Sequence, residues 1–133
     1  MDALIAQLLA LAVAWSGYPA PATAPAVHIV SAARIPCRCA GFYAYITRFH
    51  GYGAWETTGE VLLRDDVDLQ GSYGRSILLH ELVHSLQAQR GAAEFGSPLW
   101  YQREREAYWV QYRYLRADRV AAHKERRLPA GED

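Results

Sequence analysis

The chain has 133 residues, which is the length of one domain and is enough to bury a single hydrophobic core. Fourteen basic residues balance fourteen acidic ones, and 51% of the residues are hydrophobic, so the composition excludes a disordered chain. The balanced charge also argues against a nucleic acid or a membrane surface as the main partner. We therefore expect one folded domain over residues 1–133 that binds neither.

Residues 1–26 are predicted to form a helix followed by a stiff linker. Asp2 can cap a helix from about Ala3 to Trp15, which ends at Gly17 before an Ala/Pro-rich stretch. The apolar run resembles the core of a signal peptide, but no Lys or Arg precedes it, and Asp2 stands where positive charge is expected. We favour an ordinary first helix in a cytoplasmic protein. A secreted protein that loses this segment is the alternative.

Residues 27–64 are predicted to form a small sheet of three short strands. Val27–Val30 is rich in β-branched residues, Gly41–Phe49 alternates aromatic with small residues, and Glu60–Arg64 is an apolar run between charges. Cys37 and Cys39 are separated by a single residue. They are poorly placed to bridge each other or to form a four-ligand zinc site alone, so we predict two free thiols.

Residues 76–121 are predicted to contain two long helices. Ser76 can cap the first helix, which is apolar over most of its surface and so belongs in the core. That helix closes at Gly91, and the second begins near Pro98, a residue suited to a first helical turn. The second helix is expected to continue to about Ala121, with residues 122–133 as a tail that is frayed from Pro129 to Asp133. The order of helix, strands and two helices predicts an α+β fold.

The motif His80-Glu81-Leu82-Val83-His84 lies inside this first long helix. Residues four apart share a helix face, so His80 and His84 can bind one zinc ion at about 2.0 to 2.1 Å. From the next position Glu81 can reach water on the metal, as a general base must. Two unliganded histidines on such an apolar helix would be costly unless hydrogen-bonded. The motif therefore predicts a zinc site.

A catalytic zinc site needs a third protein ligand and one open position. A histidine six residues beyond His84 would define the metzincin class, but Arg90 stands there. The next helix offers Glu104 and Glu106, which point about 200° apart, so one of them can face the metal. We predict Glu104, which shares a face with the small residue Ala107.

Glu106 is expected to point outward instead, near Arg103 or Arg113. The arginines and lysine that follow, from Arg113 to Arg127, are interpreted as a solvated helix face and tail.

The two histidines, followed twenty positions later by Glu104, resemble the ligand pattern of gluzincin zinc peptidases. Residues 103–107 resemble the second-helix motif of membrane-associated gluzincins, in which the glutamate ligand lies three residues before an alanine. The short chain is most similar to the minigluzincins and to small zincin-like bacterial domains of unknown function. The similarity covers Glu60–Gln111. It departs at Tyr108, where such relatives often carry an aspartate that orients the first histidine, so that role passes to Gln111 or Tyr108.

This resemblance implies a minimal zincin-like domain and a zinc-dependent metallopeptidase. Glu81 would accept a proton from water on the zinc ion and deliver it to the leaving amine. Residues 61–63 would line the cleft, where an extended peptide or protein substrate adds as a strand. The alternative is a latent or non-catalytic zinc-binding domain that acts as a binding module, with residues 120–133 folded over the cleft as a plug. The oligomeric state is left open.

Overall fold

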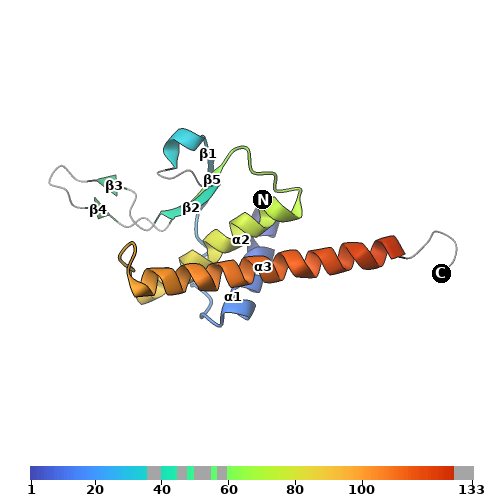
Figure 1. Ribbon diagram of the computed structural model, residues 1–133. Helices are drawn as coiled ribbons and strands as arrows, with labels where there is room; N and C mark the ends of the chain where they lie inside the picture. The colour runs from blue at the N-terminus through green and yellow to red at the C-terminus, as the bar shows by residue number, and fades with distance from the viewer. Residues whose placement is uncertain (36–39, 45–47, 50–54, 57–59, 128–133) are drawn as a thin grey trace.

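The computed structural model describes residues 1–35, 40–44, 48–49, 55–56 and 60–127. In these residues three α-helices accompany a small sheet, so the α+β class is confirmed (Figure 1). The elements, in chain order, are α1 (Asp2–Ser16), β1 (Val27–Val30), the 3-10 turn Ala32–Arg34, β2 (Gly41–Ala44), β3 (Arg48–Phe49), β4 (Trp55–Glu56), β5 (Glu60–Arg64), α2 (Ser72–Gln87), the 3-10 turn Ala88–Arg90 and α3 (Pro98–Arg127). Cys37 and Cys39 lie outside the described residues.

The first helix, α1, forms where it is predicted. It ends at Gly17, whose φ of 79° is left-handed and whose N–H donates to the Val13 carbonyl at 3.1 Å. Asp2 belongs to the first turn, and Met1 is the residue before it, so the predicted cap is wrong by one position. Ile5, Leu8 and Ala12 share one face of α1 and are buried in the core.

The principal sheet has three strands in the order β1-β5-β2. The central strand β5 is parallel to β1, with Val27 opposite Val61, and antiparallel to β2, with Gly41 opposite Leu63. Since β5 is paired along both edges, the prediction that a peptide adds to residues 61–63 is wrong. Within the described residues, the outer edges of this sheet belong to β1 and β2.

The predicted second strand, Gly41–Phe49, is two strands in the structure. Gly41–Ala44 forms β2, which pairs with Glu60 to Leu63 of β5, and residues 45–47 lie outside the described residues. Arg48–Phe49 forms β3 and pairs with β4 in a separate two-stranded sheet.

The metal-motif helix α2 begins at Ser72, so the predicted start at Ser76 is wrong. The Ser72 hydroxyl donates a hydrogen bond to the carboxylate of Asp118 in α3, and Arg75 donates to the Tyr114 hydroxyl at 2.8 Å. These contacts with a distant helix hold the first turn of α2, and local sequence cannot reveal them. Ser76 lies fully buried within the helix and donates to the Tyr73 carbonyl at 2.6 Å.

The last helix, α3, begins at Pro98 as predicted, and the backbone N–H of Trp100 donates to Ser97 Oγ at 3.1 Å. It runs to Arg127, so the predicted helix end near Ala121 is wrong, and residues 122–127 of the predicted tail are helical. Ala, Glu, Lys and Arg dominate this stretch and are strong helix formers, which accounts for the extension. Residues 128–133 of the predicted tail are outside the described residues.

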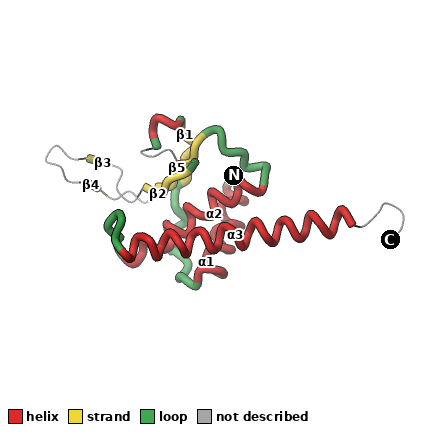
Figure 2. Tube along the Cα trace, viewed as in Figure 1, coloured by secondary structure: helices red, strands yellow, loops and turns green. Residues whose placement is uncertain are grey.

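The core lies where the three helices meet one another and one side of the sheet (Figure 2). Its buried apolar side chains are Ile5, Leu8, Ala12, Tyr18, Val61, Leu63, Leu78, Leu79, Leu82, Val83, Leu86, Ala107 and Val110. Five of them come from α2, more than from any other element, so α2 is the central element, and it carries two of the three candidate metal ligands. No helix in the described part of the chain combines the length and apolarity needed to cross a bilayer.

Replacing Leu8 with alanine tests whether α1 is integral to this core. Leu8 is 1% exposed, so Leu8→Ala should lower the free energy of unfolding by about 2–5 kcal/mol through lost burial and a residual cavity. The neighbouring Gln7 is exposed, and Gln7→Ala should change it by less than about 0.5 kcal/mol. Denaturant unfolding measures both variants. Equal effects would show that α1 does not pack as described.

Candidate metal centre

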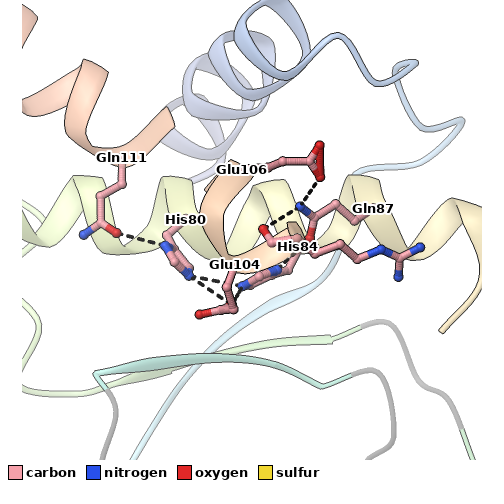
Figure 3. Close-up of polar contacts among 7 residues, drawn as sticks. His80, His84, Gln87, Glu104, Glu106 and Gln111 are labelled. Carbon is pink, nitrogen blue, oxygen red and sulfur yellow. Dashed lines mark hydrogen bonds and ion pairs between the residues drawn. The ribbon is translucent and has the colours of Figure 1, made fainter. Parts of the chain in front are cut away.

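Two histidines of α2 and one glutamate of α3 converge on a single point. His80 Nε2 lies 3.1 Å from His84 Nε2, and Glu104 Oε1 lies 2.5 Å from His84 Nε2 and 3.6 Å from His80 Nε2 (Figure 3). Among the described residues this is the one group of three metal-ligating side chains whose ligand atoms lie within 4.8 Å of one another. All three residues were predicted as ligands from the sequence.

The spacing of these atoms fits a metal ion. In a tetrahedral site with bonds of about 2.1 Å, ligand atoms are about 3.4 Å apart. The two distances from His80 Nε2, 3.1 and 3.6 Å, bracket that value. The contact between Glu104 Oε1 and His84 Nε2 is shorter, as in a charge-assisted hydrogen bond. Two imidazole nitrogens and a carboxylate oxygen can therefore hold a divalent cation.

The packing of α3 on α2 places Glu104 opposite the histidines. Ala107 and Val110 of α3 are fully buried in the core, and the small side chain of Ala107 lets the two helices approach closely. Glu104 precedes Ala107 by three residues and so lies on the same face of α3. Its side chain is 24% exposed, against 9% for His80, so the ligand group is open to solvent on one side.

Each histidine also makes a hydrogen bond through its other ring nitrogen. His80 Nδ1 lies 2.9 Å from Gln111 Oε1, and His84 Nδ1 lies 2.8 Å from Gln87 Oε1. Of the two residues predicted to orient His80, Gln111 is therefore the hydrogen-bond partner. Tyr108 packs its ring edge-on against His80 instead, with ring centroids 4.5 Å apart.

Sequence reasoning missed Gln87 as a partner of His84. The available signal was its position three residues further along the same helix, a spacing at which side chains meet.

Glu106 does not point outward, so that prediction is wrong. Its carboxylate accepts hydrogen bonds from the Tyr18 hydroxyl at 2.7 Å and from Gln87 Nε2 at 3.2 Å. Since α3 packs against α1 as well as α2, the face opposite Glu104 is also covered. Burial of the Tyr18 ring and its bond to Glu106 raise the pKa of that hydroxyl to about 12, so it stays a donor at neutral pH.

Glu81, the candidate base, lies between the two histidines in sequence and is 7% exposed. It packs against β2, where a Cβ on Gly41 would sit 3.0 Å from Glu81 Cγ. The absence of a side chain at Gly41 therefore leaves the space that Glu81 occupies. Its negative charge acts on the ligand group and is one of the influences that raise the pKa of His84.

The pKa values of Glu104 and His84 are shifted by their surroundings. Burial raises the pKa of Glu104, but hydrogen bonds to His80 and His84 outweigh burial and lower it to about 2. Burial lowers the pKa of His84, but its hydrogen bond to Glu104 and the charges of Glu81 and Glu104 leave it above 6.5. An anionic Glu104 at neutral pH is the state that a cation requires.

In comparisons with known proteins, no protein-family model, no curated protein and no solved structure matches the chain.

The His84–Glu104 pair should make the stability of the metal-free protein depend on pH. Because the Glu104 pKa is lowered in the folded protein, the stabilisation that ionised Glu104 provides is present above about pH 4.5. It is lost as the pH falls toward 2. Because the His84 pKa is raised in the folded protein, the stabilisation that protonated His84 provides is complete below about pH 6.5. It is lost as the pH rises through the pKa of His84 in the folded protein. The difference in Tm between wild type and Glu104→Gln should therefore be largest between about pH 4.5 and 6.5. Thermal unfolding in chelator measures it, and a difference that does not vary with pH would contradict the assignment.

Proposed function

We propose that the chain is a zinc-dependent metallopeptidase of the gluzincin type, which hydrolyses peptide bonds in peptide or protein substrates. The observation that supports this most is the convergence of His80, His84 and Glu104, with Glu81 beside them. Two histidines and a glutamate are the protein ligands of a well-known kind of catalytic zinc site.

Zinc is the metal that this ligand set favours. Imidazole nitrogens suit zinc, whereas calcium and magnesium prefer sites built from oxygen atoms alone. Structural zinc sites are usually closed by four protein ligands, often cysteines. In the described residues the group contains three ligands and no cysteine, which leaves a fourth position for water or substrate on the solvent-exposed side.

The chemistry divides between the metal and Glu81. A zinc ion in this position would lower the pKa of water and polarise the carbonyl of a peptide bond. Glu81 would accept the proton from the attacking water and pass it to the leaving amine. Its packing against Gly41 limits the positions that its side chain can take, which favours a fixed carboxylate.

The outer edge of β2 is the sheet edge that best suits an extended peptide. One side of β2 is paired with β5, and its first residue, Gly41, lies beside Glu81. A peptide strand added along the other side would gain main-chain hydrogen bonds and would pass close to the candidate base.

Metal analysis tests the ligand assignment. Purified protein should retain about one zinc ion per chain. The Glu104→Ala variant should no longer bind zinc tightly, because only two of the three protein ligands, the histidines, remain. Glu94 is exposed and lies in the loop before α3, so Glu94→Ala is the matched control and should keep the metal. Elemental analysis after extensive dialysis gives the ratio. A zinc-free wild-type protein that cannot be loaded with zinc would contradict the proposal.

Removing the base while keeping the metal tests the reaction. Glu81→Gln should bind zinc as the wild type does but should hydrolyse casein or a peptide library about 10²–10⁴-fold more slowly, because an amide cannot accept the proton. Product release measured by mass spectrometry quantifies the loss. If the zinc-loaded wild type and Glu81→Gln are equally inactive, the chain is a zinc-binding module and the hydrolase proposal fails.

A further inference from the structure

A glutamine side chain lies behind each metal-facing histidine, on the side away from the ligand group (Figure 3). We propose that Gln87 and Gln111 are positioning residues that keep a proton on Nδ1 of His84 and His80 and thereby assign both Nε2 atoms to the metal. The inference rests on the proposed metal site and is independent of whether the chain hydrolyses peptides.

The surroundings of Gln87 fix which end of its amide faces His84. Gln87 Nε2 lies 2.8 Å from the Arg103 carbonyl oxygen and 3.2 Å from Glu106 Oε1. Both partners can only accept, so the NH₂ group must face them. The carbonyl oxygen of the amide then faces His84 Nδ1 at 2.8 Å, and because it too can only accept, Nδ1 must carry the hydrogen.

A second chain of hydrogen bonds fixes Gln111 in the same way. The Ser76 hydroxyl donates its single proton to the Tyr73 carbonyl at 2.6 Å. Ser76 Oγ can therefore only accept from Gln111 Nε2, which lies 3.3 Å away. Gln111 Oε1 is left facing His80 Nδ1 at 2.9 Å, so this nitrogen also carries a hydrogen. Ser76 and Gln111 are both buried, so water does not compete for these groups.

Together the two chains prepare the site for a cation. With hydrogen on both Nδ1 atoms, a cation that displaces the hydrogen shared between His84 Nε2 and Glu104 would meet lone pairs on both Nε2 atoms, 3.1 Å apart, beside the Glu104 carboxylate. Three electron-rich atoms this close repel one another unless a positive charge lies among them. The amides set this arrangement without adding a negative charge of their own.

The two glutamines should respond differently to the same substitution. In Gln111→Glu the new carboxylate can still accept from His80, and the Ser76 hydroxyl can turn to donate to its other oxygen. In Gln87→Glu the second oxygen would face the Arg103 carbonyl and the Glu106 carboxylate, two acceptors that repel it. Glu106→Gln supplies a donor to that oxygen and should restore part of the loss.

The experiment measures zinc affinity and the Nδ1–H signals of both histidines in the full-length chain. Chelator competition should show Gln111→Glu within about threefold of wild type, and Gln87→Glu about 10–100-fold weaker, with partial recovery in the Gln87→Glu/Glu106→Gln double variant. The control is Gln102→Glu, the same charge change at an exposed position of α3, which should have little effect. In ¹⁵N-edited NMR spectra the His84 Nδ1–H signal should weaken in Gln87→Glu alone, since its hydrogen-bond partner is lost.

Two results would overturn the inference. One is a wild-type spectrum, zinc-loaded or metal-free, in which either histidine lacks a hydrogen on Nδ1. The other is Gln87→Glu with the same zinc affinity and His84 signal as Gln111→Glu. The wild-type spectrum shows whether both Nδ1 atoms carry hydrogen, even if a variant fails to fold or the chain binds no zinc. Failure of the peptidase proposal would appear only in the hydrolysis assay.

Discussion

The close packing of α3 against α2 is the constraint on which the site depends. His80 and His84 share a face of α2 through helical spacing alone, but Glu104 joins them only because Ala107 and Val110 are buried against that helix. The hydrophobic core therefore determines the geometry of the ligand group. Packing that shifts α3 along α2 would separate the ligands even if every one of them were retained.

The same packing accounts for the polar groups inside the core. Burying His80, Glu81 and two glutamines is costly unless each finds a partner. Here Gln111 and Ser76 satisfy His80, while Gln87, Glu106 and Tyr18 form a chain that joins His84 to the segment after α1. Residues of α3 and of the segment after α1 thus help to hold the histidines of α2. In the described residues no buried side-chain polar atom lacks a hydrogen-bond partner.

The sequence predicted the features that local pattern controls. Val27–Val30, Glu60–Arg64 and the start of α3 at Pro98 follow from β-branched runs and a proline, and the ligand spacing follows from helical periodicity. The predictions from sequence failed where contacts between distant segments determine the structure. Contacts with Asp118 and Tyr114 hold the start of α2 at Ser72, and the Tyr18 hydroxyl, from the segment after α1, donates to Glu106 and holds it inward. Neither effect has a signature within a few residues of the position concerned.

The central claim is that zinc binds to His80, His84 and Glu104, and X-ray absorption at the zinc edge of the loaded protein tests it most directly. The account predicts a first shell of nitrogen and oxygen at about 2.0–2.2 Å, with outer-shell scattering from two imidazoles. A sulfur shell at about 2.3 Å would place the metal on Cys37 or Cys39 instead. That result, or a shell without imidazole, would contradict the account.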